Sequence, residues 1–423
     1  MKKQKKPKRK PYQLVLAILL PLSVVALVLF TMSVLGRNVQ NKKTTETKVQ
    51  EAAVETENGE AGANSSGAGR TAGVFRQDLS GAEHRDTEPA EAAAAVFETE
   101  AETETETETE PVVYEDTVML FTGDVLLWDG TLNAYVNGGL DGLLAPELCQ
   151  PFREADILMI NEEFPFSNRG EPADKQFTFR CDPVYVRAFQ EMGVDIVTLA
   201  NNHTLDFGQD ALLDSLETLE GAGIPYVGAG RNLDEAKRLV TFELNGRTFG
   251  FLGASRVWPD GAWSADYDRP GMFGTYDPTQ LLEEIRKAKE VCDFVTVFVH
   301  WGIERNTTPE EYQRVMAKQY EEAGADLVIG SHPHVLQGFE FINDMPVFYS
   351  LGNFIFNTRT YDTAVVRVLV RGDGTTEFSL LPARSDGARV SLLAGEDGKQ
   401  LFSYLNTISY GAAADEQGVV RAQ

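Results

Sequence analysis

Short runs of apolar, mostly β-branched residues alternate with amphipathic segments along much of the chain after residue 117. Each apolar run has the length and composition of a buried strand. The strands are predicted at 118–124, 156–160, 195–200, 293–299 and 326–330. The helices are predicted at 183–192, 208–220, 280–291 and 309–322. Because strands and helices alternate, we expect a largely parallel sheet with helices on its faces.

The pattern changes towards the C-terminus. Apolar runs at 345–350, 364–370 and 376–381 follow one another without helices between them. They predict an antiparallel part of the same sheet or a second sheet. A hairpin is also expected around Asn245-Gly246, a favourable two-residue turn. One further helix is predicted near 401–408.

The N-terminal residues have the pattern of a membrane anchor. Seven Lys and Arg residues fall within 1–10, and 14–35 contains 22 residues without a charge. At about 1.5 Å per residue, such a helix crosses a hydrocarbon core of about 30 Å. We expect an uncleaved single-pass anchor in the cell membrane, with 1–13 cytoplasmic and the main domain extracytoplasmic. A cleaved secretory signal is the alternative, but the residues after the apolar run resemble a cleavage site poorly.

Residues 36–116 are rich in Ala, Glu, Thr, Gly and Ser and include the Glu-Thr repeat at 98–110. They contain too little apolar surface for a core, so we predict a disordered acidic linker. A domain at 117–385 and a C-terminal extension at 386–423 complete the organisation. The net charge of −26 argues against nucleic acid as a partner. Three cysteines, an odd number, do not form a complete disulfide framework.

Polar residues gather directly after the predicted strands, and four of the five histidines belong to such groups. The groups are Gly123-Asp124, Asn161-Glu162-Glu163, Asn201-Asn202-His203, His300-Trp301-Gly302 and His332-Pro333-His334. Ligands of open α/β sheets bind beyond the carboxyl ends of the strands. Histidine binds metals as a neutral imidazole and exchanges protons near pH 7. The sequence therefore predicts a metal or acid–base site at this edge.

Several side chains in these groups allow two interpretations. By strand alternation, only one of Glu162 and Glu163 points toward the site. Asp206 either orients the imidazole of His203 or caps the helix that follows. Ser350 and Asn353, in the segment Ser350-Leu351-Gly352-Asn353-Phe354, either contact substrate or shape a tight turn.

Six motifs in this order resemble the CapA family of poly-γ-glutamate capsule biosynthesis proteins, over residues 117–356. They are Gly123-Asp124, Asn161-x-Glu163-x-Pro165, Asn201-Asn202-His203-x-x-Asp206-x-Gly208, His300-Trp301-Gly302, His332-Pro333-His334-Val335 and Ser350-Leu351-Gly352-Asn353-Phe354. The family is related to the calcineurin-like metallophosphoesterases. The resemblance implies a four-layer α/β/β/α sandwich with a metal centre at the sheet edge.

The resemblance also implies roles for single residues. The metal ligands would be Asp124, Glu163, Asn202, His300, His332 and His334. They would hold one or two divalent ions such as Mn, Fe or Zn, with His203 as proton donor and Asp206 beside it. The sequence departs from metallophosphoesterases where Leu126 replaces the histidine of Asp-x-His, and where Glu163 replaces an aspartate.

The expected function is that of a metal-dependent hydrolase or transferase. It would act in the synthesis, export or anchoring of a cell-surface polymer such as poly-γ-glutamate, beside membrane subunits of a capsule machinery. The alternative is a non-catalytic accessory or polymer-binding subunit of a capsule biosynthesis complex, which the missing histidine at Leu126 favours.

Overall fold

The computed structural model describes residues 114–423. The cytoplasmic segment, the anchor at 14–35 and nearly all of the linker fall outside the described residues, so these predictions stay predictions. Among the helices of 114–423, none is both long enough and apolar enough to cross a membrane.

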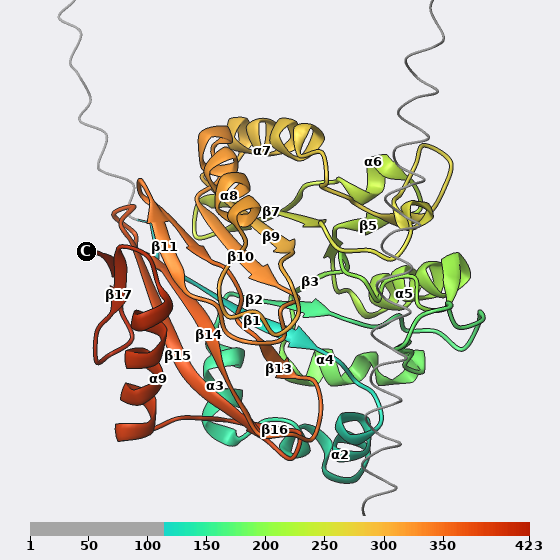
Figure 1. Cartoon of the computed structure of the whole chain (residues 1–423), viewed down its shortest axis with the longest axis horizontal. Helices are drawn as coiled ribbons and strands as arrows, with labels where there is room; N and C mark the ends of the chain where they lie inside the picture. The colour runs from blue at the N-terminus through green and yellow to red at the C-terminus, as the bar shows by residue number, and fades with distance from the viewer. Residues whose placement is uncertain (1–113) are drawn as a thin grey trace, which may run out of the picture. The chain divides into compact units, whose positions relative to one another are not determined.

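The first of two large sheets has the order β16-β15-β14-β1-β2-β3-β4, with β13 beside β1 (Figure 1). Strands β1 to β4 run parallel to one another, and β14, β15 and β16 continue the sheet in antiparallel pairing. The bounds are β1 Thr117–Val125, β2 Ile157–Glu162, β3 Ile196–Thr198, β4 Tyr226–Val227, β13 Asn353–Ile355, β14 Tyr361–Val370, β15 Thr376–Asp386 and β16 Arg389–Leu392.

The second large sheet has the order β11-β12-β10-β9-β7-β6. Its strands are β6 Val240–Leu244, β7 Arg247–Ser255, β9 Phe294–His300, β10 Leu327–Ser331, β11 Phe339–Ile342 and β12 Met345–Phe348. The predicted hairpin at Asn245-Gly246 joins β6 to β7. Of the late strands, β12 pairs in parallel with β10 of this sheet, whereas β14 and β15 extend the first sheet. The late strands therefore form both an antiparallel part of the first sheet and part of a second sheet, the two arrangements expected from the sequence.

Helices α2 to α8 cover the outer faces of the two sheets, whereas α9 packs against the core between them (Figure 1). Their bounds are α2 Gly130–Gly138, α3 Pro146–Glu154, α4 Arg187–Met192, α5 Gly208–Ala222, α6 Leu233–Ala236, α7 Thr279–Val291, α8 Glu311–Ala323 and α9 Gly395–Ile408. Short 3-10 turns are η1 Gly139–Gly142, η2 Pro183–Val186 and η3 Gly261–Trp263. The helix predicted at 183–192 is thus a 3-10 turn, η2, followed by α4.

Strand alternation produces the layers. On β1, Met119 and Phe121 point into a core that also holds Phe251 and Phe298 of the second sheet. Leu120, between them in sequence, points to the other face, where it joins the core beneath helices α3, α4 and α5. Helices α7 and α8 bury a third core against the second sheet. The order of layers is therefore helix, sheet, sheet, helix, and the expected mixed α/β fold is confirmed.

Four strand-preceding aspartates bond to the neighbouring strand at the amino edge of the sheets. Near the start of a strand, a backbone N–H can lack a partner among the hydrogen bonds between strands. A buried N–H without any hydrogen bond is energetically unfavourable. In each case one carboxylate oxygen accepts that N–H. The pairs are Asp156 with Val118 (2.8 Å), Asp195 with Leu158 (2.8 Å), Asp293 with Thr248 (2.7 Å) and Asp326 with Val295 (2.8 Å). These carboxylates have a structural use.

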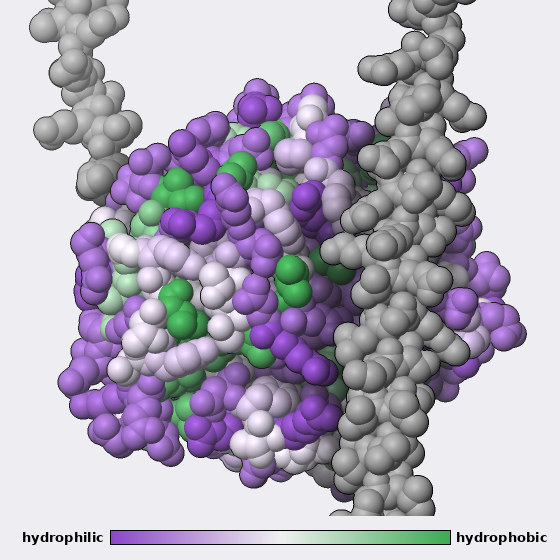
Figure 2. Space-filling view, viewed as in Figure 1, coloured by the Kyte–Doolittle hydropathy of each residue, from purple (hydrophilic) through white to green (hydrophobic). Residues whose placement is uncertain are grey.

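Residues 386–423, expected as an extension, share the core of the main domain. Strand β16 belongs to the first sheet, and α9 contributes Leu401 and Phe402 to the core between the sheets. A small hairpin of β17 Ala412–Ala414 and β18 Val420–Ala422 packs against the same core. A second small pair joins β5 Ala229–Gly230 to β8 Gly271–Met272. Hydrophilic residues cover most of the visible surface in Figure 2, with hydrophobic residues in small separate patches.

Candidate metal centre

Three buried residues from both sheets lie at the centre of the site. Asp124 ends β1, Glu163 follows β2 and His300 ends β9. One potential ligand atom from each lies within 4.8 Å of the others. Two ligands bonded to one ion at about 2.1 Å lie up to about 4.2 Å apart, so the observed separation is close to that of a metal site.

Asn161 connects these residues, a role that the sequence interpretation did not assign to it. Its side-chain nitrogen donates to Asp124 Oδ1 and to Glu163 Oε1, each at 2.9 Å. Its side-chain oxygen accepts from Asn201 Nδ2 at 3.1 Å. The parallel register of β1 and β2 places Asp124 opposite Asn161. Asn161 therefore holds two carboxylates side by side without neutralising either of them.

The motif His332-Pro333-His334 reaches the same cluster through unusual backbone conformations. The φ angles of His332 and His334 are 95° and 58°, a region that costs a residue with a Cβ about 1–3 kcal/mol. The His332 ring lies 4.7 Å from the His300 ring, measured between centroids. His334 Nδ1 lies 2.9 Å from Asp124 Oδ2 and 2.9 Å from Asn353 Oδ1. The strained turn thus aims both imidazoles at one cluster.

Asp206 contacts His203 and does not cap helix α5, the two roles that the sequence allowed for its carboxylate. His203 Nδ1 lies 2.7 Å from Asp206 Oδ2, whereas helix α5 has no side-chain cap. With the Nδ1 proton on this bond, Nε2 faces the cluster, 4.0 Å from Glu163 Oε2. Asp206 therefore orients the imidazole.

Lys175 completes this arrangement and was missed in the sequence. Its Nζ lies 2.5 Å from Asp206 Oδ1, 2.5 Å from the backbone oxygen of Asn202 and 3.2 Å from His203 Nδ1. A single lysine in a segment without periodicity gives no local signal. Only the folded chain brings it to His203.

The remaining predicted residues lie near the cluster with different contacts. Asn202 Oδ1 lies 2.7 Å from His300 Nε2. Asn353 contacts His334, as above. The Ser350 hydroxyl donates to the Val335 carbonyl at 2.8 Å and accepts from the Gly352 N–H at 3.1 Å. Ser350 thus shapes the turn, and its contact with substrate stays a prediction.

The alternation expected for the two glutamates is present. Glu163 points into the cluster, whereas Glu162 accepts a hydrogen bond from Ser215 Oγ at 3.2 Å.

Close packing of two backbone segments fixes the end of β1 before Asp124. A Cβ added to Gly123 would lie 1.9 Å from the Gly352 carbonyl oxygen, so only glycine fits before Asp124.

Burial sets the protonation of the cluster. Burial, reinforced by the charge of Asp124, raises the pKa of Glu163 well above its usual value. Burial would also raise the pKa of Asp124, but the hydrogen bond and charge of His334 together lower it. Burial lowers the pKa of His300 well below its usual value and that of His332 to about 3. At neutral pH these two imidazoles are therefore neutral, the form that binds metals.

Two buried polar atoms of the cluster find no hydrogen-bond partner within residues 114–423: Glu163 Oε2 and His332 Nδ1. Each such atom costs about 1–3 kcal/mol if nothing satisfies it. A divalent cation accepts lone pairs from both a carboxylate oxygen and a neutral imidazole nitrogen. The donor set and its unpaired atoms therefore fit a metal ion.

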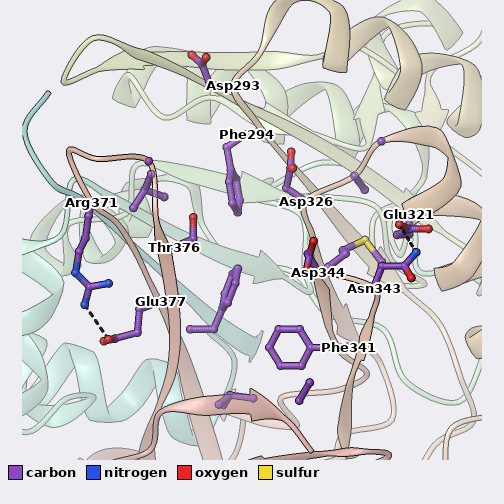
Figure 3. A pocket seen from close by; sticks show the side chains of 18 of the residues that line it. Asp293, Phe294, Glu321, Asp326, Phe341, Asn343, Asp344, Arg371, Thr376 and Glu377 are labelled. Atoms are coloured by element: carbon purple, nitrogen blue, oxygen red, sulfur yellow. Dashed lines mark hydrogen bonds and ion pairs between the residues drawn. The ribbon is translucent and has the colours of Figure 1, made fainter. Parts of the chain in front are cut away.

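A cavity lies at the opposite edge of the sheets (Figure 3). This amino-edge cleft has a volume of about 1000 Å³ and includes Asp293, Asp326 and Arg371. Asp326 pairs with Lys289 at 2.7 Å, and Arg371 pairs with Glu377 at 2.8 Å. Because these charges are paired with one another, the cleft offers no comparable set of free ligands within the described residues.

Fold and site together define a two-sheet α/β protein with buried carboxylates and imidazoles at the carboxyl edge of its strands. Residues 118–358 match the family described as "Bacterial capsule synthesis protein PGA_cap". The chain belongs to this family, which confirms the resemblance inferred from the six motifs.

Two relatives and one solved structure illustrate the similarity. The chain is 33% identical over 278 residues to "PGA biosynthesis protein CapA" of Bacillus subtilis, covering 64% of this chain and 72% of that protein. It is 32% identical over 210 residues to a "Probable polyglutamine synthesis accessory protein" of Mycobacterium tuberculosis, covering 47% and 55%. A phosphatase structure from Mycoplasma pneumoniae aligns with a TM-score of 0.41 and 15% identity, covering 64% and 95%, too distant for an argument.

Proposed function

We propose that this chain binds one or two divalent metal ions at the carboxyl edge and acts as a metal-dependent hydrolase or transferase. Its substrate would be a cell-surface polymer such as poly-γ-glutamate, during synthesis, export or anchoring. The observation that carries the proposal is the buried cluster of Asp124, Glu163 and His300, with unpaired atoms on Glu163 and His332.

The ions would be held by Asp124, Glu163, Asn202, His300, His332 and His334. A metal ion in such a site polarises a bound oxygen and lowers the pKa of a bound water. His203 presents Nε2 to the cluster while Asp206 accepts from Nδ1 and would stabilise the imidazolium, so His203, once protonated on Nε2 as well, would deliver that proton to a leaving group. The net charge of −26 repels an anionic polymer, and bound cations would offset this repulsion locally.

Membrane attachment is part of the proposal. The uncharged segment 14–35, after seven basic residues, would anchor the chain with its main domain outside the membrane. The site would then lie where a surface polymer and membrane-bound capsule-synthesis subunits are expected. Protease treatment of intact cells tests it: the domain after residue 114 should be digested, and protection of that domain would contradict the topology.

A non-catalytic accessory role is the second candidate, and Leu126 favours it. Leu126 is 2% exposed and packs in the core beneath the helices of the first sheet. Its backbone N–H donates to the Ile355 carbonyl at 2.6 Å. The residue that stands where metallophosphoesterases have a ligand histidine is therefore apolar and enclosed. One ion position would then be weak, and the site would bind polymer through metal without cleaving it.

One experiment separates the two candidates. The full-length chain is purified, its metal content is measured by mass spectrometry, and hydrolysis of phosphate-ester and γ-glutamyl substrates is assayed. The enzyme proposal predicts bound metal and turnover, both lost in His300→Ala and His332→Ala and kept in Arg371→Ala. Bound metal without turnover supports the accessory role. A metal-free chain that the histidine variants leave unchanged contradicts both.

A further inference from the structure

Four aromatic side chains form a row beside the metal centre: Trp128, Phe177, Phe179 and Phe356, hereafter the aromatic row. They come from three separate loops, after β1, after β2 and after β13. Phe179 lies at the middle, with ring centroids 5.4 Å from Trp128, 6.5 Å from Phe177 and 6.4 Å from Phe356. Three loops thus bring apolar rings to the carboxyl edge.

Two rings of the row, Phe179 and Phe356, touch the histidines of the site. The Phe179 ring lies 4.6 Å from the His203 ring, and the Phe356 ring lies 4.6 Å from the His334 ring. Phe179 is held in place by its backbone N–H, which donates at 2.7 Å to Asp206 Oδ2, the oxygen that orients His203. The carboxylate of Asp206 therefore positions both Phe179 of the row and His203 of the metal centre.

The outer end of the row faces solvent. Phe179 is only 8% exposed, but Trp128 is 45% exposed and Phe177 is 58% exposed. Aromatic rings carry a large apolar surface, and leaving it in water forfeits the gain from burial. Exposed apolar surface that continues into a site is typical of a ligand-binding surface. Core packing accounts for Phe179 but not for the two exposed rings.

We propose that the aromatic row is a substrate subsite for an uncharged, apolar group bonded directly to the group held by the metal centre. This inference rests on the proposed function, because the metal centre would hold the polar end of the same substrate; in a polymer with a charged repeat, such as poly-γ-glutamate, the apolar group would belong to the polymer's attachment and not to its repeat. The matching ligand is an oxyanion that carries a hydrocarbon or aromatic substituent of at least the size of a benzene ring. The oxyanion would lie between His203 and His334, with the substituent along Phe179 toward Phe177.

Phosphonates test the proposal because they resemble such a ligand and resist hydrolysis. Dissociation constants of methylphosphonate, hexylphosphonate and phenylphosphonate are measured by calorimetry on the full-length, metal-loaded chain. We expect the two larger probes to bind about tenfold more tightly than methylphosphonate, the ratio given by about 1.4 kcal/mol. A stronger effect for hexylphosphonate would indicate a hydrocarbon chain, and a stronger effect for phenylphosphonate a ring.

The variants Trp128→Ala and Phe177→Ala should remove this preference while leaving methylphosphonate binding and metal content unchanged. Tyr404→Ala is the matched control, because Tyr404 is 41% exposed on α9, outside the row. Equal affinity for all three probes, or a preference that survives both row variants, would overturn the proposal.

A metal-free wild-type chain would contradict the proposed function instead. In that case, saturation-transfer NMR with benzyl alcohol tests the row alone. Transfer that is lost in Phe177→Ala and kept in Tyr404→Ala supports the subsite, and transfer that is the same in all three proteins overturns it.

Discussion

At the amino edge of the two sheets, carboxylates accept backbone N–H groups and pair with Lys289 and Arg371, around a cleft of about 1000 Å³. At the carboxyl edge, Asp124 and Glu163 are fully buried, close together and bridged by a neutral amide. Both edges contain carboxylates, but within the described part of the chain only the carboxyl edge has buried carboxylate oxygens and imidazole nitrogens without a hydrogen-bond partner.

The two edges differ in the burial and pairing of their carboxylates, and this difference decides which edge would bind a cation. A partly exposed carboxylate that already accepts a hydrogen bond gains little from a ligand. A buried oxygen without a hydrogen-bond partner has lost its hydration without compensation, so a cation that binds it offsets that unfavourable free energy. Metal binding is therefore assigned to the carboxyl edge, where the carboxylates are buried.

The largest expected effect is on metal content. Glu163→Gln keeps the shape of the side chain but removes the charge that a divalent ion needs, so bound metal should fall below detection. The matched control is Glu377→Gln in the amino-edge cleft, which should retain the wild-type metal content. Mass spectrometry of the gel-filtered proteins measures both, and equal metal in the two variants would sink the assignment.

The next effect compares two Lys–Asp pairs, one at each edge. Lys175 and Asp206 are 15% and 0% exposed, whereas Lys289 and Asp326 are 39% and 29% exposed. Removing one partner of a buried pair leaves an uncompensated charge. We expect Lys175→Met to lower the free energy of unfolding by about 3 kcal/mol, and Lys289→Met by less than about 1 kcal/mol. Urea unfolding measures both, and equal losses would erase the distinction between the edges.

Metal addition should stabilise the fold by a similar amount. A ligand that binds only the folded chain, at one hundred times its Kd, adds about 2.7 kcal/mol. We expect Mn²⁺ to raise the free energy of unfolding by this amount in the wild type and in Glu377→Gln. Chelator should reverse the gain. In Glu163→Gln the same titration should leave the unfolding curve in place, and a shift there would show that the ion binds elsewhere.

The smallest effect concerns the structural aspartates of the amino edge. Asp293→Ala removes the acceptor of the Thr248 N–H, and the loss of one such hydrogen bond costs about 1 kcal/mol. Metal content should not change. Thermal unfolding measures the loss of stability, and mass spectrometry measures the metal content. A loss of metal in Asp293→Ala would mean that the amino edge influences metal binding at the carboxyl edge.

The sequence predicted what depends on local pattern. Apolar runs located the main strands, and polar residues at their ends located the site, because parallel strands bring their carboxyl ends to one edge. Alternation also predicted that only one of Glu162 and Glu163 points into the cluster. Each of these inferences needs only a few neighbouring residues.

What the sequence did not show depends on distant contacts. Lys175 reaches Asp206 across 31 residues of chain, from a segment without periodicity. The aromatic row joins three loops that are far apart in sequence. Residues 386–423 looked like an extension because their apolar positions find partners in cores formed by elements far away in sequence.

Anomalous X-ray diffraction from crystals grown with Mn²⁺ tests the central claim most directly. The account predicts an anomalous peak within bonding distance of Asp124, Glu163 and His300, at about 2.0–2.2 Å from each ligand atom. A map without a peak there, or with a peak only among the carboxylates of the amino-edge cleft, would contradict it.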